Sequence, residues 1–445
     1  MPHHRENLIR LGMSPHQAEI KAAMLTRCDE ALDGIDASAH RWSAWVPGRI
    51  ELLGKHTDYC GGRSLLCTVE RGFAVRVALR TDARIRAVDV AAGRTCETAL
   101  TPDARAADGS WQNYVATMAR RLARNFPSAR CGVDLAFASD LPIAAGMSSS
   151  SALMIAVFVA LAKSNDLRSS EEFRNAIYSR EELASYLGAV ENGDSFRTLA
   201  GDSGVGTFGG SQDHTAIMCA EDAHVVQYSF APVRREAVYL LPPTHTFVVG
   251  ASGVLAEKTA GAREGYNRAA RLVRHLLTAW NAETQRSDAT LADAVRSDAG
   301  AADALRRVAR TAATPEFPAE SLGSRLEQFL LESLTLVPEA ASALARGAVD
   351  DLGTVADRSQ EAAERWLGNQ VPETIALARL ARHCGATAAS AFGAGFGGSV
   401  WALVPVGEAH AFMVSWAEHY QAAFPSAAER AVFFVSPAGP AAQQF

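Results

Sequence analysis

A run of serines that opens a wholly apolar segment is the feature that most constrains the fold of this chain. The segment "GMSSSSALMIAVFVALAK", residues 146–163, is typical of a loop that leads into a buried helix. Its longest apolar run, Ile155–Ala162, is far too short to cross a bilayer, which takes about 20 residues. Such a helix needs a folded core around it, so other parts of the chain must cover it.

Strand-like and helix-like stretches alternate along the rest of the chain. Val-rich and alternating patterns predict strands at residues 49–53, 64–80, 83–92, 132–142, 237–253 and 429–437. Helical spacing of apolar residues predicts helices at 14–32, 111–126 and 171–192, with several more between 257 and 383. At 445 residues the chain is too long for one small core. We expect an α+β protein of two domains, residues 1–235 and 236–445.

Composition excludes some partners. The net charge of −6 argues against nucleic acid or an anionic membrane as the main partner. Seven scattered cysteines without a CxxC pair predict a reduced, cytoplasmic protein, and the N-terminal residues show no signal peptide.

The serine run is a candidate phosphate-binding loop. Gly146, Ser148, Ser149 and Ser150 precede the apolar helix, and a helix N-terminus offers free N–H groups and a positive dipole end to an anion. The ordinary alternative is a serine N-cap on a core helix, which needs no ligand.

A glycine cluster supplies a second candidate. Gly393, Gly395, Gly397 and Gly398 run into a strand, and such density suits a backbone that must approach a ligand or another backbone closely. A tight packing turn explains the cluster equally well.

A polar cluster lies in "GRIELLGKHTDYCGG", residues 48–62. Arg49 cannot act as a base, whereas Asp58 and, in "GGSQDHTAI", Asp213 could orient or deprotonate a hydroxyl. Turn formation is the alternative for either aspartate. Lys55 is one of only four lysines, the others being Lys21, Lys163 and Lys258.

Six ordered segments together resemble the GHMP small-molecule kinases, and the galactokinase family in particular. Residues 48–62 resemble the galactokinase signature GR(V/I)NLIGEHTDYNGG, and "PIAAGMSSSSAL" resembles PxGxGLSSSA. Further matches are "WQNYV" to W-x-N-Y-V, Glu191-Asn192 to the AEN motif, "YNR" from Tyr266 to YNxRR, and "FGAGFGGS" to TGAGFGGC, while "SQDHTAI" stands where G-x-M-D-Q is expected.

The resemblance implies a two-domain fold, with a mixed sheet and helices in the N-terminal domain and a ferredoxin-like C-terminal domain. The active site would lie in the cleft between them. Asp213 would be the base or orienting carboxylate, with Arg49 beside it. His56, Asp58 and Tyr266 would bind the sugar.

The resemblance also implies an ATP site with Mg²⁺. The implied ATP-binding residues are Gly146, Ser148, Ser149, Ser150, Trp111, Gly395 and Gly397. The metal would lie near Ser150 and Glu191.

Departures from the family pattern bear on the substrate. Lys55 replaces the Glu that contacts the far end of the sugar in galactokinases, and Glu51 replaces an Asn; the first glycine of PxGxG is Ala144. Lys55 and Glu51 could form an ion pair that restores the wall of the sugar site. Alternatively, Lys55 meets a negative group on the substrate, such as the carboxylate of a uronic acid.

These observations predict an ATP-dependent sugar 1-kinase that works on galactose, as a monomer or weak homodimer. The alternatives are a kinase of an acidic or modified sugar (galacturonate-like or heptose), a non-catalytic galactokinase-like sugar sensor, and a mevalonate- or homoserine-type kinase.

Overall fold

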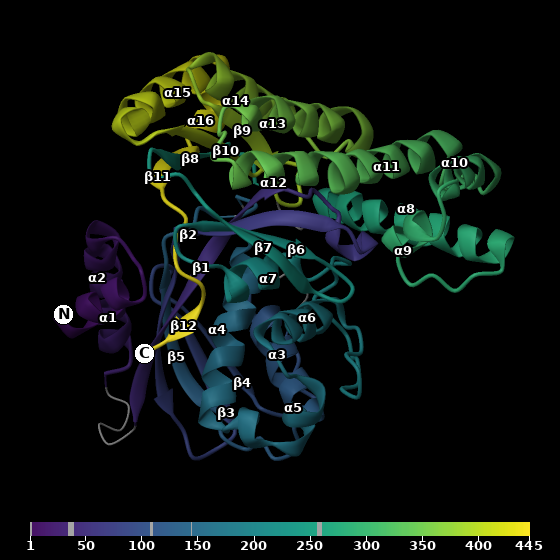
Figure 1. Cartoon of the computed structure of the whole chain (residues 1–445). Coiled ribbons are helices and arrows are strands. Elements are labelled where there is room, and N and C mark those ends of the chain that lie inside the picture. The colour runs from purple at the N-terminus through teal and green to yellow at the C-terminus, as the bar shows by residue number, and fades with distance from the viewer. Residues whose placement is uncertain (1, 34–39, 107–109, 144, 256–259) are drawn as a thin grey trace.

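Two β-sheets organise the protein (Figure 1). The computed structural model describes residues 2–33, 40–106, 110–143, 145–255 and 260–445, so Ala144 and Lys258 lie outside the described residues. The first sheet has the order β12-β1-β2-β5-β3-β4, with β6 pairing β2 and β7. Its strands are β1 (Arg41–Leu53), β2 (Arg63–Leu79), β3 (Arg84–Asp89), β4 (Arg94–Ala99), β5 (Val133–Ser139), β6 (His224–Ser229), β7 (Arg234–Leu240) and β12 (Gln443–Gln444).

Both faces of this sheet are covered by helices. Alternation along β2 directs Ala74 and Ala78 to the cluster formed with α1 and α2, and directs Val75 and Val77 to the larger core on the other side. The first pair of helices is α1 (Pro2–Arg10) and α2 (Pro15–Ala31). The opposite set is α3 (Gln112–Asn125), α4 (Ser149–Ser164), α5 (Glu171–Ala176), α6 (Arg180–Asn192) and α7 (Gln212–Cys219), with the short turns η1 (Asp58–Cys60) and η2 (Leu167–Ser169). The apolar helix α4 is buried, as predicted.

The second sheet is antiparallel, in the order β11-β8-β10-β9. Numbered along the chain within this sheet, the strands lie fourth, first, third and second, which is the ferredoxin-like arrangement that the family resemblance implied. The strands are β8 (His245–Ala251), β9 (Ala388–Phe392), β10 (Ser399–Pro405) and β11 (Val432–Ser436). Helices α13 (Asp351–Ala362), α14 (Pro372–His383), α15 (Ala409–Ala423) and α16 (Pro425–Ala428) accompany it, with the turn η5 (Val406–Glu408).

A helical layer lies between β8 and β9 in sequence and extends sideways from the two sheets (Figure 1). Its members are α8 (Ala260–Thr284), α9 (Leu291–Arg296), α10 (Ala301–Thr311) and α11 (Ala319–Leu331). The π-helical turn η3 (Glu332–Leu336), α12 (Val337–Ala345) and, after α13, the π-helical turn η4 (Ala363–Leu367) continue the chain. The layer has its own apolar cluster, which includes Trp280, Leu305 and Phe329 and receives Cys60 from the loop after β1.

The predicted strand 237–253 is wrong as a single element. It divides at Pro242-Pro243, where two residues lack an N–H donor, into β7 of the first sheet and β8 of the second. The domain division at 235/236 stays a prediction. Among the described helices, none combines the length and apolar character that a membrane span requires.

Candidate active site

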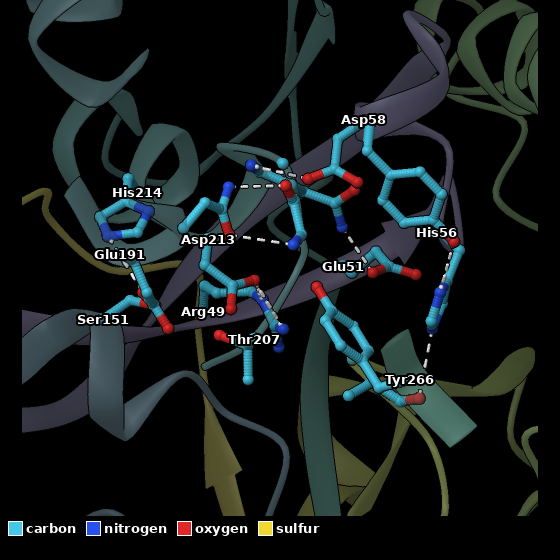
Figure 2. A pocket seen from close by; sticks show the side chains of 17 residues that line it. Arg49, Glu51, His56, Asp58, Ser151, Glu191, Thr207, Asp213, His214 and Tyr266 are labelled. Atoms are coloured by element: carbon cyan, nitrogen blue, oxygen red, sulfur yellow. Dashed lines mark hydrogen bonds and ion pairs between the residues drawn. The ribbon is translucent and has the colours of Figure 1, made fainter. Parts of the chain in front are cut away.

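The centre of the candidate site is an arginine that joins three distant segments. Arg49 lies on β1 beside a register irregularity between Pro47 and Arg49. Its Nε donates to Asp213 Oδ1 at 2.8 Å, and its Nη1 donates to the Gly146 carbonyl at 2.6 Å. Figure 2 shows the Arg49 guanidinium and the Asp213 carboxylate facing each other. The arginine is buried, while the Asp213 side chain keeps 32% of its exposure at the first turn of α7.

The serine loop, residues 145–151, opens α4 beside this pair. Ser148 is the N-cap with φ of 62°, and its side chain does not cap the helix. The buried Ser148 Oγ has no hydrogen-bond partner among the described residues, whereas Ser149 and Ser150 are half-buried. An unpaired buried hydroxyl at a helix N-terminus is costly unless a ligand completes it.

A carboxylate also contacts the serine loop. Glu191, at the end of α6, accepts a hydrogen bond from Ser151 Oγ at 2.8 Å. His214 Nε2 lies 3.3 Å from the same carboxylate oxygen. Figure 2 shows Ser151, Glu191 and His214 grouped on one side of Asp213.

The glycine loop, residues 393–398, lies directly against the serine loop. Ser399 Oγ donates to the Ala145 carbonyl at 2.7 Å. A Cβ on Gly393 would lie 2.5 Å from the Gly146 carbonyl oxygen and 3.3 Å from an Arg49 nitrogen. Gly395 and Gly397 instead allow close approach to Asn369 and Val254. The glycine density therefore serves contact between backbones, and its predicted contact with ATP stays a prediction.

A cavity that is partly open to solvent adjoins the Arg49–Asp213 pair. Seven of the predicted site residues line it: Arg49, Glu51, His56, Asp58, Glu191, Asp213 and Tyr266. Tyr266 comes from α8, and its ring lies 5.3 Å from that of His56, centroid to centroid.

His56 lines the cavity with its ring, but both ring nitrogens already have hydrogen-bond partners within the protein. Burial, together with the charge of Arg325, lowers the pKa of His56 to about 3, so the imidazole is neutral. Its Nε2 lies 3.2 Å from the Ala394 carbonyl and its Nδ1 lies 2.9 Å from the Tyr59 hydroxyl. Because the carbonyl can only accept, Nε2 carries the proton and Nδ1 accepts from Tyr59. Both ring nitrogens therefore have partners within the protein, and the predicted sugar-binding role of His56 stays a prediction.

Asp58 and Glu51 place two buried carboxyl groups at the same cavity. Burial raises the pKa of Asp58 to about 6, although the backbone N–H of Gln212 donates to it at 3.1 Å. Burial raises the pKa of Glu51 further, to about 8, against the opposing charges of Arg49 and Lys55. Gln212 Nε2 donates to Glu51 Oε2, while Glu51 Oε1 has no hydrogen-bond partner among the described residues.

Lys55 points away from the cavity. Its side chain is buried, and Nζ donates to Ser359 Oγ at 2.7 Å. No Glu51–Lys55 ion pair forms among the described side chains, and Lys55 is absent from the cavity lining. Both sequence-based interpretations of Lys55, an ion pair with Glu51 and a direct substrate contact, therefore need correction, because a nearer hydroxyl holds the ammonium.

Trp111 is also removed from this cavity. Its ring packs edge-on against Phe137 at 5.8 Å, and the Arg94 guanidinium lies 5.8 Å from its centroid. Its predicted role near the adenine stays a prediction.

Hydrogen bonds to an asparagine before it and an asparagine after it in the sequence fix the glycine-rich stretch 201–210. Asn192 exchanges two hydrogen bonds with Gly209, and Asn267 bonds to Phe208 and Gly206. This stretch contributes Thr207, Gly209 and Gly210 to the cavity lining.

Among the lining residues that the sequence did not assign to the site are Ser151, Thr207 and Gln212. Ser151 was the last of the serine run, and Gln212 directly precedes Asp213, so proximity to a motif was the available signal. Thr207 lies in the glycine-rich stretch 201–210, whose composition is typical of a functional loop.

Comparison with known proteins first defines the class. Residues 113–202 match the family model for the GHMP kinase N-terminal domain, and residues 36–79 match the galactokinase galactose-binding signature. The chain therefore carries a GHMP kinase N-terminal domain preceded by a galactokinase signature, which confirms the predicted resemblance.

The more particular likeness is to galactokinases. A galactokinase from Actinobacillus pleuropneumoniae serotype 5b (strain L20) is 33% identical over 117 residues, which is 26% of this chain and 30% of that protein. The match thus spans about a third of this curated relative.

The fold agrees over a longer span. The crystal structure of Lactococcus lactis galactokinase complexed with galactose has a TM-score of 0.75 at 22% identity, covering 94% of this chain and 99% of that one. The Methanococcus jannaschii mevalonate kinase has a TM-score of 0.50 at 12% identity, covering 91% and 99%. The chain therefore has the galactokinase fold.

Proposed function

We propose that the protein transfers the γ-phosphoryl group of ATP to the anomeric hydroxyl of a monosaccharide, giving a sugar 1-phosphate and ADP. One observation carries the proposal: Arg49 binds Asp213 and the Gly146 carbonyl together. A carboxylate for the hydroxyl and a fixed cation line one cavity, and the cation also binds the loop that opens a helix N-terminus suited to phosphate.

The chemistry needs little beyond positioning and charge stabilisation. Asp213 accepts the proton of the anomeric hydroxyl as its oxygen attacks the γ-phosphorus. The bond between that phosphorus and the β–γ bridging oxygen breaks, and ADP leaves. Arg49 keeps Asp213 ionised and stabilises the negative charge that develops on the transferring group.

The serine loop suits ATP with a magnesium ion. The unpartnered Ser148 hydroxyl and the N-terminus of α4 fit phosphate oxygens. In the described part of the chain no cluster of three or more His, Cys, Asp or Glu side chains could hold a metal alone. Mg²⁺ commonly binds through one or two protein groups plus substrate phosphates. Ser150 and Glu191 would supply the protein groups, and the metal would neutralise charge on the phosphates.

Galactose is the first candidate for the sugar. The galactokinase signature over residues 36–79 and the galactokinase relatives support it. The acidic-sugar alternative depended on Lys55, which is held by Ser359. The sensor alternative is disfavoured because the Asp213–Arg49 pair is intact.

The setting we propose is the cytoplasm, supported by seven cysteines that are all free thiols. A monomer or weak homodimer remains our expectation.

A sugar panel tests the function. Purified protein with MgATP and galactose should release ADP and form a sugar 1-phosphate visible by phosphorus NMR. Asp213→Asn should lower kcat by about 10²–10⁴-fold, because the proton acceptor is lost. The matched control is Asp103→Asn, which changes an exposed aspartate and should retain full activity.

Two outcomes would contradict the proposal. Tight binding of ATP and sugar without turnover on any sugar would favour the sensor. Full activity of Asp213→Asn would remove the assigned role of this carboxylate.

A further inference from the structure

One face of a helix that lies far along the chain forms hydrogen bonds to the loop that follows β1. Arg325, Gln328 and Glu332 are spaced three and four residues apart across α11 and η3, so they share a helix face. Each bonds to the backbone of the loop. The bonds run from the N–H groups of Gly54 and Lys55 to Glu332 Oε1 at 2.8 and 3.3 Å, from Gln328 Nε2 to the Lys55 carbonyl at 3.0 Å, and from Arg325 Nη2 to the His56 carbonyl at 2.5 Å.

These contacts are buried and specific. Gln328 and Glu332 are each 0% exposed, and Arg325 is 2% exposed. Residues 54–57 belong to no helix or strand, so their buried backbone groups must find partners elsewhere. The shape of the loop therefore depends on residues that lie about 270 positions further along the chain.

The Lys55 side chain is linked to the same Glu332 carboxylate through Ser359. Its Nζ donates to Ser359 Oγ, and Ser359 lies 2.8 Å from Glu332 Oε2. A hydroxyl carries one proton, so Ser359 accepts from the ammonium and donates to the carboxylate. The ammonium thereby compensates a carboxylate that is wholly removed from water, and the carboxylate holds the N–H groups of Gly54 and Lys55.

We propose that Lys55 is a positioning residue: acting through Ser359 and Glu332, it fixes the loop that carries His56 and Asp58, and it does not contact the substrate. The inference rests on the proposed function only where substrate preference is concerned. It implies that Lys55 gives no reason to expect an acidic sugar, because this replacement for the family's glutamate is engaged inside the protein.

Hydrogen–deuterium exchange of the unliganded protein tests the positioning role. Lys55→Met and Ser359→Ala should each raise the exchange rates of the amides of residues 54 and 55 by about 10-fold or more, while amides of β2 stay protected. The matched control Lys163→Met changes an exposed lysine on α4 and should leave the loop unaltered. Unchanged exchange at residues 54 and 55 in both variants would overturn the proposal.

Ser359→Ala removes only a hydroxyl, so it carries the test if Lys55→Met does not fold. The exchange measurement needs no turnover. Its outcome is therefore independent of whether the protein proves to be a sugar kinase.

Steady-state kinetics test the substrate half of the inference. Both variants should raise KM for the sugar several-fold and leave KM for ATP unchanged. The double variant should be no worse than the poorer single variant, because the two side chains act through one carboxylate. The ratio of kcat/KM for galactose to that for galacturonate should not change. A shift of that ratio in Lys55→Met but not in Ser359→Ala would show direct contact between Lys55 and the substrate, and would overturn the inference.

Discussion

Glu51 is a buried acid that faces both the protein and the cavity. Gln212 donates to one carboxyl oxygen, and the other oxygen has no partner among the described residues. Burial is the main reason why the pKa of Glu51 rises from 4.5 to about 8. At neutral pH the group is therefore mostly protonated, and it can donate a hydrogen bond to a sugar oxygen.

The raised pKa of Glu51 predicts a pH-dependent stability difference. Between pH 4.5 and 8 the unfolded chain releases a proton that the folded protein keeps, so this group lowers stability as pH rises. Glu51→Gln removes the titration. Relative to wild type, the variant should gain on the order of 3 kcal/mol between pH 5 and pH 8.5.

Denaturant unfolding at the two pH values measures that difference. Glu320→Gln, at an exposed position of α11, is the matched control and should show no such trend. A difference that stays constant with pH would mean that Glu51 is ionised in the folded state.

For individual residues, the sequence predicted the Arg49–Asp213 pair. It did not predict that the Lys55 side chain would point toward Ser359. The pair follows from the resemblance of the two motifs that carry Arg49 and Asp213 to those of the galactokinase family. Lys55 turns toward Ser359, which lies 304 residues away, and no local pattern around Ser359 or Glu332 marks them as partners. A buried contact of this kind depends on packing that residue spacing does not encode.

The glycine loop and the serine loop fit closely because Gly393 has no side chain where the two loops meet. Gly393 has φ of +81°, and a Cβ there would lie 2.5 Å from the Gly146 carbonyl oxygen. That carbonyl also accepts from Arg49. The packing of Gly393 therefore affects the position of Arg49, the arginine that we propose as catalytic.

Gly393→Ala should disturb both stability and activity. Adding the methyl group forces the two loops apart and strains the backbone, at a cost of about 2–4 kcal/mol. The apparent Tm should fall, and kcat/KM should fall with it because Arg49 shifts. Differential scanning calorimetry and initial rates measure the two effects.

Gly407→Ala is the control, since a Cβ there has nothing within 4 Å. It should change neither quantity. A Gly393→Ala protein with unaltered rates would show that the loop contact does not position Arg49.

Periodicity predicted elements better than it predicted their partners. The periodic pattern at 111–126 corresponds to α3, and the wholly apolar segment within 146–163 corresponds to the buried helix α4. The stretch 237–253 reads as continuous because Val and aromatic residues flank Pro242-Pro243. Its two halves nevertheless pair in different sheets, and pairing is a non-local property.

Across the whole molecule, the last residues rejoin the first sheet. Gln443 and Gln444 pair with Trp45 and Ala44 of β1, and the Phe445 N–H donates to the Ser43 carbonyl at 2.9 Å. In Figure 1 this yellow segment descends from β11 to lie beside β1. A two-residue strand is too short for any sequence pattern to reveal.

Deletion of residues 440–445 should therefore destabilise the protein. It uncovers the edge of β1 and the surface against which the buried Ala441 and Ala442 now pack. We expect the apparent Tm to fall by several degrees and aggregation on heating to increase, measured by calorimetry and light scattering.

Gln444→Ala keeps the backbone pairing and changes an exposed side chain, so it should behave as wild type. Equal stability of the deleted and full-length chains would show that β12 contributes nothing.

The return of β12 means that the second sheet is attached by two connectors, residues 241–244 and 437–442. The two sheets also share one apolar core, which includes Phe247 and Trp401 of the second sheet and Val46 and Val69 of the first. The second sheet therefore cannot move away from the first without opening that core and stretching both connectors.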